Sequence, residues 1–306
     1  MQRTMLFNRV ALAATAFGVM SLAVQAQEIT VEHAQGETTL PETPQTVLTF
    51  DLAALDTLDA LGIDVTGVPE TTYPEHLSEY AGEDYEKIGS LFEPDYEAVN
   101  AIQPDLIIVA GRSSSVYSEL AAIAPTVDLS NDWEDFEGSI KDNARILGEI
   151  FDKTDEVEQM IADFDETKAE TQEAAADAGT GLVVLTSGGE VTAYGPGSRF
   201  GWVHSTAGVT PAVEDVEAAT HGDAISFEFI LETNPDWLFV IDRDAAVSSG
   251  GEAAEQVLDN ELMAQTTAWS EDQVVYIDPV RAYIINGGLP ALHAMVEQIG
   301  DALAGD

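Results

Sequence analysis

Residues 136–178 read FEGSIKDNARILGEIFDKTDEVEQMIADFDETKAETQEAAADA, without proline and with Gly138 and Gly148 as their only glycines. Apolar residues recur three or four positions apart along one helix face: Ile140, Ala144, Leu147 and Phe151, then Val157, Ile161 and Phe164. A helix of about 40 residues would extend about 60 Å at ~1.5 Å per residue, longer than an ordinary domain helix. No heptad is sustained enough for a coiled coil. We therefore expect one long helix over residues 137–178 that joins two lobes.

Short apolar stretches alternate with helical stretches on both sides of this segment. The expected strands are 47–50, 65–68, 106–110, 127–129, 182–186, 191–194, 238–241 and 274–277, and the main expected helices are 51–61, 116–123, 225–232 and 289–303. Such alternation is typical of parallel sheets covered by helices. The expected fold class is α/β, with mainly parallel sheets in an N-terminal lobe over residues 27–136 and a C-terminal lobe over residues 179–306. No repeat of 20 to 50 residues is visible.

The first 26 residues have the layout of a secretory signal peptide. Arg3 and Arg9 flank a short basic region, residues 10–24 form an apolar run, and small residues lead to Ala26. The run is shorter than the ~20 residues that a membrane-spanning helix needs, and no later stretch is long and apolar enough. We therefore expect a signal peptide over residues 1–26, cleavage after Ala26, and a soluble protein in the periplasm.

The composition excludes several classes of function. Because the chain has no cysteine, disulfides, thiolate metal sites, cysteine nucleophiles and a lipid-anchored cysteine are excluded. The 56 acidic and 11 basic residues give a formal net charge of −45, which excludes nucleic-acid binding through a phosphate-neutralising surface. A hydrophobic fraction of 45% argues against disorder, so the acids are expected to form a solvated surface, as in a saline habitat.

The few basic residues outside the signal are informative because acids surround them. Four lie in the 136–178 stretch, where acids on the helix can pair with them. Four others are arginines that each follow an expected strand: Arg112, Arg199, Arg243 and Arg281. Ligands of open α/β sheets bind beyond the carboxyl ends of the strands, where arginine presents a permanent charge and a planar fork of donors. Each arginine alone could merely neutralise nearby carboxylates, but the four together predict an anionic ligand between the lobes.

Two further side chains suit a ferric ion. His221 lies in a polar loop before an expected helix, and Tyr283 lies two residues beyond Arg281. Phenolate oxygen is a hard donor and imidazole is a common iron ligand, although either residue alone is more often structural. The other histidines lack HxxxH or HxH spacing, so a dedicated zinc or manganese site is not indicated. No tightly bound cofactor is expected.

Motifs of catalysis are weak in this sequence. The loop GPGSRFG at residues 195–201 departs from GxGxxG spacing, and the chain has neither a GK[ST] phosphate loop nor a GxSxG elbow. An exported hydrolase that uses two carboxylates stays open, but no pair stands out among the acids. A binding protein without enzymatic activity is the favoured interpretation.

Four segments carry a resemblance to a known family. Residues 44–69, PQTVLTFDLAALDTLDALGIDVTGVP, resemble an opening strand–helix–strand, and residues 96–108 resemble a leading glutamate followed by KPDLII. Residues 225–236 resemble the equivalent stretch of a second lobe, and residues 283–289 resemble a C-terminal YLxGGGL. Together they resemble the periplasmic siderophore-binding proteins of iron-uptake ABC transporters, whose two lobes are joined by one long helix. The resemblance covers essentially the whole chain after the signal.

The chain is similar to the catecholate branch of that family, which binds enterobactin-like and petrobactin-like ligands. The resemblance implies that Arg112, Arg199 and Arg243 surround an anionic ferric catecholate. It also implies that His221 and Tyr283 complete the iron shell, as a histidine and a tyrosine do in some members.

The sequence departs from the family pattern beside the expected tyrosine. Asn286 stands where glycine is usual, and Ala282 stands where a tryptophan often precedes the tyrosine, which changes the expected pocket wall. Arg281 is either a fourth pocket cation or a surface residue. Another iron chelate, haem or cobalamin stays open as the ligand, although the last two would need a more apolar cleft.

The resemblance further implies how cargo is handed over. In this transporter class one glutamate on each lobe docks onto arginines of the inner-membrane permease, and Glu97 and Glu228 match those positions. Acids favoured at a helix start by the helix dipole explain the same residues equally well. We expect a monomer with a ferric siderophore and a permease as partners, and little movement of the lobes.

Overall fold

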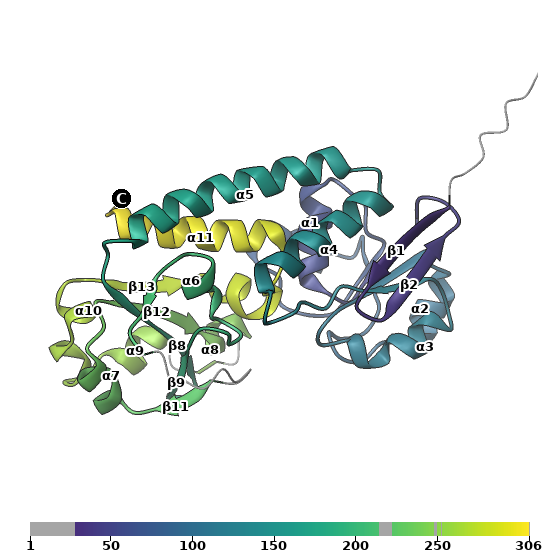
Figure 1. Cartoon of the computed structure of the whole chain (residues 1–306). Helices are drawn as coiled ribbons and strands as arrows, with labels where there is room; N and C mark the ends of the chain where they lie inside the picture. The colour runs from purple at the N-terminus through teal and green to yellow at the C-terminus, as the bar shows by residue number, and fades with distance from the viewer. Residues whose placement is uncertain (1–27, 214–221, 248–249, 252, 306) are drawn as a thin grey trace, which may run out of the picture.

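The computed structural model describes residues 28–213, 222–247, 250–251 and 253–305. The expected signal peptide and its cleavage site after Ala26 lie outside the described residues, as does His221. The chain forms two α/β lobes with a long helix along both of them, which confirms the expected fold class (Figure 1). Within the described part, no helix combines the length and apolar character needed to cross a membrane.

The N-terminal lobe is built on a fully parallel five-stranded sheet in the order β5-β4-β3-β6-β7. Its strands are β3 (Val47–Thr49), β4 (Gly67–Val68), β5 (Glu86–Lys87), β6 (Leu106–Val109) and β7 (Thr126–Asp128), and its helices are α1 (Leu52–Ala60), η1 (Glu75–Ala81), α2 (Tyr96–Ile102), η2 (Ser114–Val116) and α3 (Tyr117–Ala121). An antiparallel hairpin of β1 (Ile29–His33) and β2 (Gly36–Leu40) precedes the sheet. The four residues of β6 are all buried, as in a sheet that is covered on both faces.

The C-terminal lobe has a mixed sheet in the order β11-β9-β8-β12-β13, with β10 also pairing with β8. Its strands are β8 (Thr180–Ser187), β9 (Glu190–Tyr194), β10 (Thr210–Pro211), β11 (Asp223–Ile225), β12 (Trp237–Asp242) and β13 (Val274–Ile277). Its other elements are α6 (Trp202–Ser205), α7 (Phe227–Thr233), α8 (Arg243–Ala246), α9 (Ala254–Leu258), η3 (Met263–Gln265), α10 (Thr267–Ser270), η4 (Arg281–Ile285) and α11 (Leu289–Ala304). β9 runs antiparallel to β8 and to β11, whereas β10, β8, β12 and β13 are parallel.

The long connecting helix is present as α5 (Thr154–Ala175), but it is shorter than expected, because residues 136–153 form a separate helix and a turn. α4 (Phe136–Ile150) ends before Asp152, whose positive φ of 55° is incompatible with a continuing helix. The backbone N–H of Lys153 then donates to the carbonyl of Gly148 at 2.7 Å. A Cβ at Gly148 would lie 2.9 Å from Val157 Cγ2, so the glycine allows the two helices to approach closely. The segment is therefore a helical hairpin.

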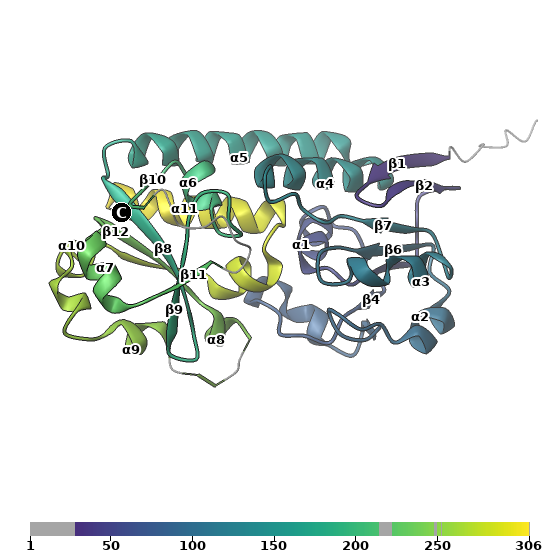
Figure 2. The same cartoon turned by 60° about the horizontal axis from the view of Figure 1, so that its bottom comes forward.

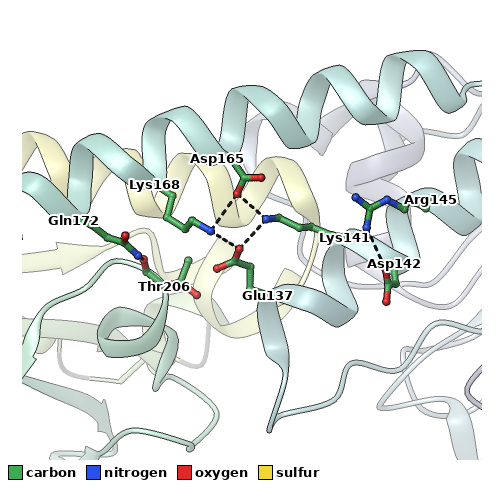
Figure 3. A network of polar contacts seen from close by, with 8 residues as sticks. All are labelled: Glu137, Lys141, Asp142, Arg145, Asp165, Lys168, Gln172 and Thr206. Atoms are coloured by element: carbon green, nitrogen blue, oxygen red, sulfur yellow. Dashed lines mark hydrogen bonds and ion pairs between the residues drawn. The ribbon is translucent and has the colours of Figure 1, made fainter.

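Ion pairs cross from α4 to α5 and hold this hairpin together (Figure 3). Glu137 Oε1 accepts from Lys141 Nζ at 2.7 Å and from Lys168 Nζ at 2.6 Å. Asp165 lies within 2.6 Å of Lys141 and 3.1 Å of Lys168, so charges of opposite sign alternate around a square. Both ammonium groups also lie over the buried ring of Phe164.

Helix α11 packs along α5 and reaches the N-terminal lobe (Figure 2). Near the C-terminal end of α5, Thr171 Oγ1 donates to the carbonyl of Val296 at 3.1 Å. At the start of α11, the buried carboxylate of Asp56, on α1, accepts from the backbone N–H of Ala291 at 2.9 Å. An acid at a helix N-terminus accepts a hydrogen bond from a free N–H and interacts favourably with the helix dipole. The N-terminal and C-terminal lobes are thus joined by α5 and by the docked α11.

Candidate ligand-binding site

Arg112 and Arg243 extend from the carboxyl ends of two parallel strands, where the sequence predicts them. Arg112 lies in the turn after β6, which is closed by a hydrogen bond from Ser113 Oγ to the carbonyl of Ala110 at 3.1 Å. Arg243 is the first residue of α8, directly after β12, and Asp242 caps that helix by accepting from Ala245 N at 2.9 Å. The end of each strand therefore fixes the point from which a guanidinium group extends to Tyr283, across the lobes for Arg112 and within the C-terminal lobe for Arg243.

Arg199 arrives by a different route. It follows β9, which is antiparallel to β8 and ends with Tyr194 beside Val183, away from the carboxyl end of β8. The tight loop after β9 brings the arginine back, because Ser198 Oγ donates to the carbonyl of Gly195 at 2.6 Å and Gly197 has a positive φ of 79°. The rule of strand carboxyl ends therefore does not account for Arg199, although the residue joins the other two.

Tyr283, on η4, is the point where the three arginines meet. Its backbone carbonyl accepts from Arg112 Nη2 and from Arg199 Nη2, each at 2.7 Å, and its phenol oxygen accepts from Arg243 Nε at 2.8 Å. Arg112 Nη1 also donates to the carbonyl of Ile284 at 3.0 Å. The carbonyls at the end of a helix lack helical partners, so they are free to accept these donors.

The charges around Tyr283 change its acidity. Burial alone would raise the pKa of the phenol, but the hydrogen bond and positive charge of Arg243, together with the charge of Arg199, outweigh it and lower the pKa below its usual value. The guanidinium carbons of Arg199 and Arg243 lie 4.5 Å and 5.4 Å from the centre of the ring. Burial and the nearby Arg112 lower the pKa of Arg199, which arginine's high ordinary pKa leaves charged. The site therefore stabilises the deprotonated form of Tyr283 relative to that of an ordinary tyrosine.

Two hollows flank this cluster and share Arg112. One, of about 440 Å³, is lined by Glu70, Thr71, Thr72, Ser90, Leu91, Phe92, Arg112, Arg243, Ala246, Val247, Tyr283 and Ile284. The other, of about 480 Å³, is lined by Asp51, Ala110, Gly111, Arg112, Ser130, Asn131, Trp133, Arg199 and Asn286. Burial raises the pKa of Asp51 despite backbone hydrogen bonds and the charge of Arg112, so the acid in this hollow is less readily ionised. Both hollows are bounded by residues of the two lobes.

The structure brings together four of the predicted ligand residues and leaves Arg281 apart from them. Arg112, Arg199, Arg243 and Tyr283 form the cluster. Arg281 instead donates to Asp278 Oδ2 at 3.4 Å and lines neither hollow. His221 lies outside the described residues, so its place as an iron ligand stays a prediction.

Three residues of the site were not predicted as ligand residues from the sequence alone. Phe92 and Trp133 line the two hollows, but nothing local distinguishes them from other aromatic residues. Asn286 stands out only by its departure from the family pattern. With its amide oriented so that both atoms have partners, Asn286 accepts from Arg199 Nε at 2.9 Å and donates to the carbonyl of Ala282 at 3.3 Å.

The two glutamates expected to dock on a permease occupy equivalent places in the two lobes. Glu97 lies in the first turn of α2, capped by Asp95, and Glu228 lies in the first turn of α7, capped by Ser226. Both are exposed. The pKa of Glu228 is lowered mainly by a hydrogen bond from its own backbone N–H, and also by one from the Ser226 hydroxyl.

The similarity of the lobes extends beyond these helices. At the same spacing, α2 ends at Gln103 and α7 at Asn234, each with a positive φ and each followed by Pro-Asp. The two aspartates then hold the start of a neighbouring strand: Asp105 accepts from Thr46 N at 2.9 Å, and Asp236 from Thr180 N at 2.7 Å. The chain thus repeats one helix–turn–strand unit, once per lobe, with an exposed glutamate at the head of each.

Comparisons with known proteins agree with this architecture. The petrobactin-binding protein YclQ of Bacillus subtilis is 38% identical over 282 residues, which cover 90% of this chain and 89% of that protein. Its crystal structure matches with a TM-score of 0.87 over 90% of this chain and 99% of that one. The ferric-anguibactin-binding protein FatB of Vibrio anguillarum is 32% identical, covering 89% of this chain and 86% of that protein.

A further solved structure and a family model point the same way. The periplasmic catecholate-siderophore binding protein VctP of Vibrio cholerae is 33% identical with a TM-score of 0.82, covering 92% of this chain and all of that one. A family model described as periplasmic binding protein matches residues 47–280. The chain therefore belongs to the periplasmic binding protein family.

Proposed function

We propose that this protein captures a ferric siderophore of the catecholate type and delivers it to an ABC permease in the inner membrane. The observation that carries the proposal is the convergence of Arg112, Arg199 and Arg243 on Tyr283 between the lobes. Relatives named for petrobactin, ferric anguibactin and catecholate siderophores support the same ligand class.

The chemistry of the site suits an anionic ferric complex. Ferric catecholates carry net negative charge, and fixed guanidinium donors replace the water that the complex loses on entry. The lowered pKa of Tyr283 makes its phenol easier to deprotonate, and phenolate is a hard oxygen donor for ferric iron where the siderophore leaves a coordination site open. His221 is the second proposed iron donor. Arg281 is paired with Asp278 and is not proposed to contact the ligand directly.

The same proposal includes the setting in which the protein acts. Residues 1–26 direct export and are removed after Ala26, and the protein acts as a monomer in the periplasm without catalysing a reaction. Turnover assays on anionic ester substrates test the absence of catalysis. Hydrolysis of such a substrate would contradict this part of the proposal. Mass spectrometry of the exported protein gives the cleavage site directly.

Intrinsic fluorescence of the mature protein, titrated with a tetradentate ferric catecholate, tests the ligand class. Ferric hydroxamate, haem and cobalamin serve as comparisons. Saturable quenching by the catecholate, weakened by Arg199→Ala and by Tyr283→Phe, is expected, whereas Arg145→Ala on α4 is the matched control outside the site. Saturation by another chelate alone would leave the transport role and remove the catecholate assignment.

Permease docking is tested separately from ligand binding. Charge reversal at both Glu97 and Glu228 is expected to abolish uptake and leave ligand affinity unchanged, because both side chains are exposed and neither lines one of the two hollows. The matched control reverses Glu119 and Glu255, exposed first-turn acids on α3 and α9. Loss of ligand binding in the first variant, or equal loss of uptake in both, would contradict the docking role.

A further inference from the structure

Phe92 is an apolar ring on the surface beside the candidate site. It is 59% exposed, the most exposed large hydrophobic side chain among the described residues, followed by Tyr96 at 40%. A single exposed apolar residue is ordinary and needs no explanation by itself. Phe92, however, lines the hollow of about 440 Å³ that also contains Arg112, Arg243 and Tyr283.

The loop that carries Phe92 is held in one conformation. Gly89 and Pro94 pair as an isolated antiparallel bridge, and Ser90 N donates to the carbonyl of Glu93 at 2.9 Å. Ser90 Oγ accepts from the backbone N–H groups of Phe92 at 3.2 Å and of Glu93 at 3.0 Å. Gly89 has a φ of 114°, and a Cβ there would lie 2.4 Å from the Glu93 carbonyl. The ring is therefore presented by a preorganised backbone, which lowers the entropy lost when a ligand contacts it.

The walls of this hollow divide by chemistry. Arg112, Arg243 and the Tyr283 hydroxyl provide positive charge and hydrogen bonding, and the acid Glu70 and the hydroxyl residues Thr71, Thr72 and Ser90 line the same hollow. Leu91 and Phe92 from the N-terminal lobe, with Ala246 of α8 and Val247 directly after that helix, provide apolar surface. Such a hollow fits a ligand that is anionic at its metal-binding oxygens and apolar and planar next to them, as an aromatic chelating ring is.

We propose that Phe92 stacks against an aromatic ring of the bound ferric complex and so makes the site selective for aryl chelators. The proposal rests on the proposed function, because it concerns the same hollow and the same ligand. Offset or edge-to-face aromatic pairs contribute about 0.5–1.5 kcal/mol beyond the area that they bury, which corresponds to about a twofold to tenfold change in affinity.

Two substitutions separate the ring from its apolar bulk. Phe92→Tyr keeps the ring, and Phe92→Leu keeps an apolar side chain without π-electrons. With a tetradentate ferric catecholate as the probe, we expect Phe92→Tyr to bind within about twofold of wild type and Phe92→Leu to bind about threefold to tenfold more weakly. Tyr96→Leu, at the neighbouring exposed aromatic residue that lines neither hollow, is the control and should bind as wild type does.

The outcomes distinguish this proposal from the function on which it rests. Wild-type affinity in Phe92→Leu overturns the stacking role while the catecholate function stands. Equal weakening in Phe92→Leu and Phe92→Tyr overturns it as well, because the shape of the wall and not its aromaticity then matters. Failure of the wild-type protein itself to bind the catecholate overturns the proposed function. Thermal unfolding of each variant shows whether the fold is intact.

Discussion

At the scale of single residues, Arg243 controls the acidity of the Tyr283 hydroxyl. Because its guanidinium donates to the phenol oxygen, the deprotonated form is stabilised and the pKa is lowered. Tyr283 is therefore expected to titrate below the usual value of about 10. If Tyr283 binds iron as proposed, it loses its phenol proton, and a lower pKa reduces the free energy needed to remove that proton.

Tyrosinate absorbance measured against pH tests this expectation, with the spectrum of Tyr283→Phe subtracted from that of wild type. Burial raises the pKa of Tyr276 to about 12 and also raises the pKa of Tyr73, so neither should overlap with Tyr283. In Arg243→Gln the Tyr283 transition should move to higher pH. A Tyr283 that titrates with the other tyrosines, or that is unaffected by Arg243→Gln, would contradict the assigned role of the arginine.

Asn286 makes a second prediction, because it combines an unusual backbone with a contact to Arg199. Its φ of 42° is a conformation that glycine adopts readily, so Asn286→Gly should leave the fold intact. The variant loses the hydrogen bond to Arg199 Nε, and we expect ferric-catecholate affinity to fall about twofold to tenfold. Fluorescence titration measures the affinity, and thermal unfolding controls for stability. Unchanged affinity would show that Arg199 is held in place without Asn286.

Much of the candidate site could be predicted from the sequence because cations are rare in it. Arg112 and Arg243 follow strands whose ends point at the site. Arg199 was also predicted from its place after a strand, but that argument assumes a parallel strand. β9 runs antiparallel to its neighbours, and the loop after it returns Arg199 to the site. Phe92 could not be found, because its proximity to Arg243 depends on contacts between segments far apart in the chain.

At the scale of elements, Glu137 is the acid on which Lys141 and Lys168 of the α4–α5 hairpin converge. Glu137→Gln removes its charge and weakens two charge-assisted hydrogen bonds at a partly buried position, so we expect a loss of about 1–2 kcal/mol in unfolding free energy. Urea unfolding measures it. Glu156→Gln, which breaks an exposed pair with Lys153 on the same hairpin, is the control and should change the midpoint little. A Glu137→Gln midpoint equal to that of the control would contradict the role of the network.

The contribution of Glu137 should depend on pH in a defined direction. Burial would raise the pKa values of Glu137 and Asp165, but Lys141 and Lys168 outweigh it and lower both. An acid whose pKa is lowered by folding stabilises the folded protein above its pKa in the unfolded chain, which is about 4. This stabilisation is lost as the pH falls through the lower pKa of the folded state. The difference between wild type and Glu137→Gln should therefore shrink in acid.

The hairpin also shows where periodicity stops being informative. The apolar pattern correctly indicated one buried helix face, but Phe151 and Val157 are six positions apart, and this interruption is where the chain turns. Pairs such as Lys168 with Glu137 are too far apart in sequence for one helix and identify the reversal only once the structure is known. The eight expected strands agree with the structure within about two residues, but β1, β2, β5, β10 and β11 were not expected. The antiparallel direction of β9 depends on tertiary pairing that local composition does not encode.

At the scale of the whole molecule, the two lobes share packing as well as a connecting helix. Ile284, Ile285 and Ala291, from η4 and α11, are buried in the same cluster as Leu55 and Leu58 of α1. The carboxylate of Asp56 holds the start of α11, and Arg112 donates to the carbonyls of Tyr283 and Ile284 across the lobes. A wide hinge opening would break these contacts and expose apolar surface at about 25 cal/mol per Å².

We therefore expect the lobes to move little on ligand binding, with loops and side chains adapting instead. Small-angle scattering of the free and the loaded protein should give superimposable curves. Asp56→Ala removes the cap on α11 and leaves a buried N–H without its partner, so this variant should unfold more easily and should be the one in which loading compacts the molecule measurably. Glu97→Ala, an exposed acid at the start of α2, is the control and should behave as wild type does. A clear decrease in the radius of gyration of the wild-type protein on loading would show that the Asp56 and Arg112 contacts form only in a closed state, and that the lobes open widely without ligand.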